Sequence, residues 1–213
     1  MIFFTGFCYF PNMTNKPEQI RLGDIAVVRS GLVLSRKQAR DSSDIRYPLL
    51  NLRSINAGGY IDLKQTDVFD ASEHLSTEYL SRIDDVIIRM SMPYTAVLID
   101  ETTAGIVISS NFVIIRCDRQ IILPTYLFWL INRPVVKHAI YESTSGNMLG
   151  AVKAKYFSDF MVDLPSISVQ RRIAAMNALA IKETQLLHRL AYEKERYYNQ
   201  LIDKIYKETK RGQ

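Results

Sequence analysis

Two stretches of the chain concentrate side chains of the types that can contact DNA. Arginine and lysine neutralise phosphates, and arginine, asparagine, glutamine, serine and threonine side chains on loops can hydrogen-bond to base edges. The first stretch supplies Arg29, Arg36, Lys37, Gln38, Arg40, Arg46, Asn51 and Arg53, and the second supplies Ser145, Asn147, Lys153 and Lys155. These residue types predict binding of double-stranded DNA, although ordinary solvated charge would give the same pattern.

No comparable group of residues predicts catalysis. The chain lacks the serine-nucleophile, zinc-protease, P-loop and dinucleotide-binding motifs. Asp100 and Glu101 end an apolar run, but no lysine lies near them to complete a nuclease site. The Asn/Asp-Pro-Pro-aromatic motif and the glycine-rich loop of a methyltransferase are also absent. We therefore expect a chain with no catalytic residues of its own.

Metal binding is not expected either. His74, His138 and His188 are far apart in the sequence, and Cys8 and Cys117 form no CxxC pair, so no zinc-ligand spacing exists. The two cysteines are expected to be passive thiols in a reducing cytosol. No run of about 18 apolar residues is present, so no segment is expected to span a membrane. The expected location is the cytoplasm, with no membrane partner.

The composition is that of a folded globular protein whose charge is unevenly distributed. The 213 residues, 47% of them hydrophobic, suffice for one packed domain and an appendage. The net charge of +5 conceals nine basic against five acidic residues in 1–64, three against nine in 65–118, and ten against five in 169–213. This distribution predicts a polarised surface, with a polyanion on one face and a different partner elsewhere.

Short β-branched runs separated by turn residues predict a compact, curved β core rather than a repeated strand–helix–strand pattern. The expected strands are 25–29, 47–52, 60–63, 86–90, 96–100, 106–109, 111–116 and 152–165. Residues 75–82 have the pattern of a short helix. The segment after Pro124 also reads as helical, with a break at Pro134 because proline interrupts a helix. The fold class that follows is α+β.

The C-terminal region predicts one long helix that pairs with another helix. Over 169–208 the apolar residues recur at three- and four-residue steps, and such a helix would be about 60 Å long. The stripe comprises Ile173, Met176, Ala180, Leu187, Leu190, Tyr197, Leu201 and Ile205, and Ser168 is the candidate N-cap. A small domain cannot cover this length, so a coiled-coil partner is expected. The alternative is a helix that folds back on its own domain.

Several motifs in a fixed order give the chain a resemblance to a known family. A Thr-Ser-Gly loop at 144–146 leads to a segment that closes on Leu-Pro at 164–165, and QRRIA at 170–174 opens the long helix. They are preceded by IRLGDIAVVRSG at 20–31, DDVIIR at 84–89 and SSNFVIIR at 109–116. Over about 20–205 the chain resembles the DNA-specificity subunit of type I restriction-modification systems. The usual subunit has two recognition domains and two long helices, so this chain resembles a half-length form.

The resemblance implies a division into an N-terminal extension (1–19), a DNA target-recognition domain (20–167) and a long helix for dimerisation and spacing (168–213). It also implies that the chemistry belongs to methyltransferase (modification) subunits, which hold S-adenosylmethionine, and to a restriction/translocase subunit that uses ATP and Mg²⁺. This chain would bind no cofactor itself. With one recognition domain per chain, a two-fold homodimer through antiparallel long helices would complete a bipartite, inverted-repeat site.

Two further expectations concern the limits and the class of the protein. Met13 begins a polar lead-in to the first motif, so translation is expected to start there rather than at Met1. The residues also fit a coiled-coil interaction adaptor without DNA contact, or an inactive, truncated specificity-gene product. An adaptor would bind DNA weakly and equally across sequences, whereas a specificity subunit prefers one site.

Overall fold

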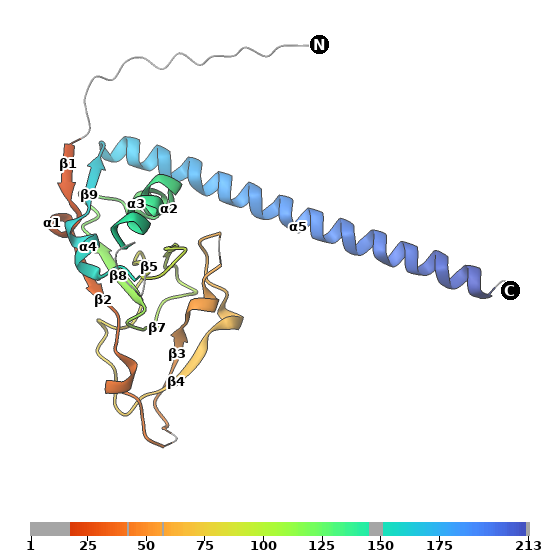
Figure 1. The fold of residues 1–213 in the computed structure, drawn as a ribbon, viewed down its shortest axis with the longest axis horizontal. Helices are drawn as coiled ribbons and strands as arrows, with labels where there is room; N and C mark the ends of the chain where they lie inside the picture. Colours follow the sequence, from red (N-terminus) through yellow and green to blue (C-terminus); the bar gives the residue numbers. More distant parts are fainter. Residues whose placement is uncertain (1–17, 42, 57, 145–150, 212–213) are drawn as a thin grey trace, which may run out of the picture.

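The protein consists of a β-rich head at one end of a single long helix (Figure 1). The computed structural model describes residues 18–41, 43–56, 58–144 and 151–211. The predicted α+β class is confirmed, because small sheets and short helices are followed by the helical arm α5 (Ile167–Arg211). Cys8 and the Met13 start lie outside the described residues. In the described part, no helix combines the length and the apolar character needed to cross a membrane.

The elements of the head follow one another in short steps. The strands are β1 (Glu18–Arg21), β2 (Ala26–Ser30), β3 (Arg46–Leu50), β4 (Asp67–Asp70), β5 (Val86–Arg89), β6 (Ala96–Leu98), β7 (Val107–Ile108), β8 (Phe112–Cys117) and β9 (Met161–Leu164). The helices are α1 (Leu22–Ile25), α2 (Pro124–Asn132), α3 (Pro134–Thr144) and α4 (Ala154–Asp159). The 3-10 turns are η1 (Leu34–Arg36), η2 (Leu52–Ser54) and η3 (Leu63–Gln65).

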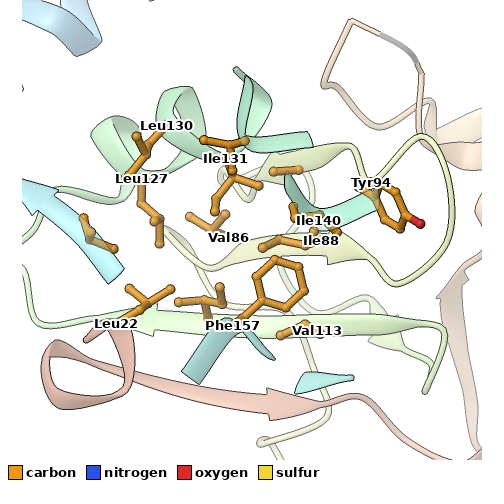
Figure 2. Packing of buried hydrophobic residues seen from close by; sticks show 14 of the residues in the cluster. Leu22, Val86, Ile88, Tyr94, Val113, Leu127, Leu130, Ile131, Ile140 and Phe157 are labelled. Atoms are coloured by element: carbon orange, nitrogen blue, oxygen red, sulfur yellow. The ribbon is translucent and has the colours of Figure 1, made fainter. Parts of the chain in front are cut away.

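The sheet β2-β8-β5-β6 is antiparallel and forms the centre of the head. Its runs 86–88 and 113–115 are buried on both faces, which explains why these strands read as continuous apolar runs. Residues from α1, α2 and α4, among them Leu127 and Phe157, pack on one face (Figure 2). A second cluster around Leu50 packs on the other face. The core is therefore built in two layers about this sheet.

Two smaller sheets extend the head. β3 pairs antiparallel with β4 and parallel with β7, which places much of the first predicted DNA-contacting stretch on this sheet and beside it. β1 pairs antiparallel with β9, and Gln19 lies opposite Asp163. The chain thus returns to its first described strand immediately before α5 begins, so the arm leaves from the N-terminal side of the head (Figure 1).

Most of the predicted elements are present with shifted ends. The strands expected at 25–29, 47–52, 86–90, 96–100, 106–109 and 111–116 correspond to β2, β3, β5, β6, β7 and β8. The helical segment after Pro124 is interrupted before Pro134, as predicted, and continues as α3. The long C-terminal helix is confirmed and begins slightly earlier than expected.

Three predictions in the middle of the chain are wrong. Residues 75–82 form turns instead of a helix, because Leu80 bridges to Val107 in a neighbouring strand. Residues 60–63 make only the single bridge from Ile55 to Ile61 before the chain enters η3. The segment 152–165, expected to be one strand, contains the helix α4, and only β9 at its end is a strand.

The N-cap prediction is also wrong. The carbonyl oxygen of Ser166 accepts hydrogen bonds from the backbone N–H groups of Val169 (2.9 Å) and Gln170 (3.0 Å). Ser166 therefore precedes the first turn of α5, and Ser168 lies inside that turn. The two serine hydroxyls lie 3.0 Å apart and hydrogen-bond to each other.

Candidate nucleic-acid interface

The first predicted stretch lines a hollow beside the edge strand β2. Just after β2 the chain turns at Gly31, where a Cβ atom would overlap the backbone of Ser109, and then enters η1. The hollow has a volume of about 530 Å³ and is lined by Val27, Arg29, Ser30, Gly31, Leu32, Val33, Arg36, Lys37 and Tyr79. Three of the predicted DNA-contacting cations therefore converge at one place on the head.

The guanidinium of Arg29 is held from two sides in this hollow. Its Nη1 donates a hydrogen bond to Glu78 Oε2 at 2.6 Å, and its Cζ lies 4.9 Å from the centre of the Tyr79 ring. The hydrogen bond raises the pKa of Arg29 and lowers the pKa of Glu78, so both groups are charged at neutral pH. A stacked and paired guanidinium has a defined direction, which suits recognition of a base or a phosphate.

Three further cations of this stretch pair with carboxylates of the acidic middle segment. The pairs are Lys37 with Glu73, Arg46 with Asp70, and Arg53 with Asp67. The basic and acidic segments therefore share one surface, whereas the sequence predicted separate faces. All three pairs are exposed, and such pairs typically contribute about 0–1 kcal/mol each. A phosphate can consequently replace any of these carboxylates at small cost.

Arg36 and Arg40 have a different environment. Both are exposed, and within the described part of the chain neither side chain makes an ion pair or a hydrogen bond. Gln38 lies between them and forms a backbone bridge to Ala71 while its residue remains exposed. Arg36 and Arg40 are thus the cations of the first stretch that are most available to an external anion.

Asn51 has a structural role that the sequence did not indicate. Its Nδ2 donates to the carbonyl oxygen of Gln65 at 2.7 Å and to Asp67 Oδ2 at 2.9 Å. Its Oδ1 accepts from the backbone N–H and the hydroxyl of Ser54, each at 2.9 Å. The amide caps η2 and ties it to the chain after η3. Base contact by Asn51 would require several of these hydrogen bonds to break.

The second predicted stretch is described only from residue 151 onward, so Ser145 and Asn147 lie outside the described residues. Lys153 precedes α4 with an exposed side chain. Lys155 Nζ lies 3.2 Å from Asp159, which also pairs with Arg21 at 2.7 Å. These cations lower the pKa of the Asp159 carboxyl, with Lys155 as the larger cause.

The fold brings the two predicted stretches to neighbouring elements. α4 packs against β2, and both lie on the side of the head that faces away from the distal part of α5 (Figure 1). Lys153 just before α4, Lys155 in α4 and the hollow beside β2 therefore form a candidate interface of two parts. Tyr79 belongs to it and was missed, because its contact with Arg29 joins residues that are far apart in the sequence. No local pattern signals such a contact.

The arm packs against α2 of the head through its N-terminal part, and arm residues as far as His188 line a hollow beside the head. Ile173 is half-buried against the head's core and Ala174 is buried, so Ile173 has a packing role in the head, and its role in pairing stays a prediction. Ala180 lines a hollow with Asn56, Gly58 and Tyr60 of the head. The alternative of a helix folded back along its own domain is not what the structure shows, because residues 182–208 are exposed.

The other predicted stripe residues lie open on the surface of the arm. Their exposed fractions range from 40% to 69%, and they are Met176, Leu187, Leu190, Tyr197, Leu201 and Ile205. Further large apolar residues are exposed beside them, including Leu179, Leu186 and Ile202. An apolar surface of this length on a water-exposed helix indicates an interaction site.

Comparisons with known proteins agree with this arrangement at the level of the fold. No family model and no curated protein matches the sequence. The HsdS subunit from Thermoanaerobacter tengcongensis has a TM-score of 0.63 and 20% identity, over 84% of this chain and 46% of that chain. A chain from a structure addressing complex assembly and conformational transition of the type I R-M system has a TM-score of 0.65 and 20% identity, over 85% and 46%. The chain has the fold of type I specificity subunits.

A third match supports the same fold and defines its extent. The type I restriction-modification S subunit from M. genitalium has a TM-score of 0.51 and 12% identity, over 80% of this chain and 41% of that chain. The chain thus spans less than half the length of each of these specificity subunits. One head and one arm correspond to the half-length form that the motifs predicted.

Proposed function

We propose that the chain is a non-catalytic, half-length DNA-specificity subunit of a type I restriction-modification complex. Its head reads one half of a bipartite site, and its arm joins it to a second head. The observation that carries this proposal is the combination of an HsdS-type fold with a single head and a single exposed arm. A bipartite target requires two heads, and we assign the second head to a partner of the same kind.

The head contacts double-stranded DNA through the candidate interface beside β2 and α4. Arg36, Arg40 and Lys153 bind phosphates, because their charges are exposed and unpaired in the described structure. Arg29 is the candidate for base contact, because its guanidinium is oriented by Glu78 and Tyr79. Arginine pairs with guanine in the major groove through two parallel hydrogen bonds.

The second head comes from a second copy of the chain through antiparallel pairing of the arms. α5 has 45 residues and is about 68 Å long at 1.5 Å per residue. Two-fold pairing buries the exposed stripe of each arm in the other and places the heads at opposite ends. The resulting DNA target is an inverted repeat with a fixed spacer.

All chemistry belongs to the partner subunits in this proposal. Methyltransferase subunits hold S-adenosylmethionine, and a restriction/translocase subunit uses ATP and Mg²⁺. The chain determines which DNA sequence the complex recognises and how far apart the two half-sites lie.

Co-expression with a methyltransferase subunit encoded beside the gene tests the proposal directly. Host DNA is then sequenced for methylated adenines, with and without this gene. A bipartite methylated motif that disappears with the gene supports the specificity role, and an inverted repeat supports the homodimer. An unchanged methylation pattern, together with no co-purifying methyltransferase, refutes the proposal.

A coiled-coil adaptor is the second candidate, and one observation favours it. Four predicted DNA-contacting cations, Arg29, Lys37, Arg46 and Arg53, are already paired with carboxylates. An adaptor would bind DNA weakly and with equal affinity for all sequences, whereas a specificity subunit would keep its preference for one site as the salt concentration rises. Competition between specific and non-specific duplexes at two salt concentrations separates the two functions.

A further inference from the structure

The junction between head and arm contains a fully buried polar side chain, Gln170, one turn into α5. Its Oε1 accepts a hydrogen bond from the backbone N–H of Leu123 at 2.9 Å. Its Nε2 donates to the carbonyl oxygens of Ile121 at 3.1 Å and Pro165 at 2.9 Å. Both amide hydrogens and the amide oxygen are therefore used, as a buried amide requires.

These partners belong to two separate parts of the head. Ile121 and Leu123 lead into α2, and Pro165 follows β9 immediately before the arm. One side chain of the arm thus joins the start of α2 to the end of β9. Hydrogen bonds are directional, so this arrangement constrains the rotation and the tilt of α5 where it leaves the head.

The apolar contact between α2 and α5 gives a weaker constraint on the angle. The arm presents the small residues Ala174 and Ala178 toward α2, and a hollow of about 400 Å³ lies beside them. Thr125 and Phe128 of α2 line the same hollow. Incompletely filled packing between small side chains permits several crossing angles, because dispersion contacts have no preferred direction.

The length of the free arm amplifies any change at this junction. Residues beyond 181 are exposed, and Asn199 lies about 44 Å along the helix from Gln170 at 1.5 Å per residue. A tilt of about 10° at Gln170 would displace Asn199 by about 8 Å, which is more than two base-pair steps of about 3.4 Å. A device that sets the distance between half-sites therefore needs a rigid joint.

We propose that Gln170 is the positioning residue that fixes the exit angle of the arm from the head. Given the function proposed above, it thereby fixes the spacer length between the two half-sites. Gln170 contacts no DNA in this account and acts only through the direction of α5.

The first experiment measures the angle within one chain and needs no DNA. Nitroxide labels are placed at Glu101→Cys, in an exposed turn of the head, and at Asn199→Cys, on the side of the arm opposite Leu187 and Leu201. Cys8→Ser removes one of the two native thiols, and the other, Cys117, is largely buried. Labelled chains are mixed with excess unlabelled chain, so that pulsed electron spin resonance reports only intrachain distances.

The variant Gln170→Met keeps the length of the side chain but removes the amide, and Gln200→Met makes the same change at an exposed position of the arm. We expect the distance distribution to broaden or shift by about 8 Å in Gln170→Met, and to stay unchanged in Gln200→Met. An unchanged distribution in Gln170→Met overturns the proposal, as does equal broadening in both variants.

A second variant protects the test against misfolding. In Gln170→Glu the carboxylate can accept from Leu123 but cannot donate to the two carbonyl oxygens, whereas the protonated acid can donate to one of them. Partial narrowing of the distribution on acidification supports the hydrogen-bond account. A distribution that is broad and independent of pH, in a head that still melts cooperatively, contradicts it.

The consequence for spacing is measured separately, by sequencing methylated DNA from cells that carry Gln170→Met. Methylation of half-sites with spacers one base pair longer or shorter supports the link from angle to spacer. A broadened distance distribution with an unchanged spacer length overturns the link between exit angle and spacer. The role of Gln170 in fixing the angle of the arm would remain supported. If cells that carry the wild-type chain show no methylation that depends on it, the proposed function is refuted, while the spin-label result remains valid.

Discussion

Charging the apolar stripe of the arm is the sharpest test of how the chain assembles. Leu187 and Leu201 lie fourteen residues apart on one side of α5, with exposed fractions of 58% and 40%. Full burial of a leucine contributes about 1.5–3 kcal/mol, so burying these fractions in both chains contributes about 4 kcal/mol to the dimer. Leu187→Asp with Leu201→Asp removes this contribution and adds four carboxylates to the interface. We expect the dissociation constant of the dimer to rise at least about 1,000-fold.

The assay is sedimentation velocity over a range of concentrations, with circular dichroism to verify that the head remains folded. The control is Asn199→Asp, which adds a carboxylate to the same distal part of the arm. Asn199 lies two positions before Leu201 and hence about 200° around the helix. Wild type and control should be dimers, whereas the leucine variant should be a monomer. A leucine variant that remains dimeric at micromolar concentration would refute the assignment of the interface to this stripe.

Three further predictions concern the head. Arg36→Ala with Arg40→Ala should reduce the slope of log affinity against log salt by about 1.8 in a fluorescence-anisotropy titration, and an unchanged slope would remove both residues from phosphate contact. Glu73→Gln releases Lys37 from its ion pair and should strengthen binding to non-specific duplex DNA; weaker binding would contradict competition between carboxylate and phosphate. Burial, helped by nearby acidic groups, raises the pKa of Cys117 to about 12, so in a Cys8→Ser chain at pH 8 this thiol should react with Ellman's reagent only after denaturation. Rapid reaction in the folded chain would mean that the thiol is accessible.

Local patterns predicted the parts of the fold that depend on local physics. The runs at 86–88 and 113–115 form strands because β-branched residues favour strands. Both runs are buried in the central sheet. The long helix followed from the three- and four-residue recurrence of apolar residues, and the interruption before Pro134 from the missing N–H of proline. These features require only neighbours in the sequence.

Features that depend on distant residues could not be predicted in the same way. The helix expected at 75–82 was replaced by turns because Leu80 pairs with Val107. The sequence predicted Arg53 as a DNA-contacting residue without indicating that β4 brings Asp67 to it as an ion-pair partner. Likewise, the QRRIA motif identified the start of the arm without indicating that Gln170 bonds to Ile121 and Pro165.

Under the proposed function, a single head is expected to bind DNA weakly, which would give the arm a second role. Several basic residues of the interface are already paired, so an incoming phosphate exchanges one partner for another and gains little free energy from that residue. Net attraction then depends on a few unpaired cations, Arg36, Arg40 and Lys153, which is a small number for stable binding. Two heads on a rigid arm change this balance, because binding of the first half-site presents the second head at millimolar effective concentration.

This coupling holds only if the geometry of the arm matches the DNA, since avidity is lost when the two sites cannot be engaged together. Weak heads therefore make recognition depend on the spacer as well as on the bases. The monomeric Leu187→Asp, Leu201→Asp variant should consequently lose nearly all its DNA affinity, even though both substitutions lie on the arm and outside the head. Full affinity in that monomer would mean that one head suffices, and that spacing has no part in recognition.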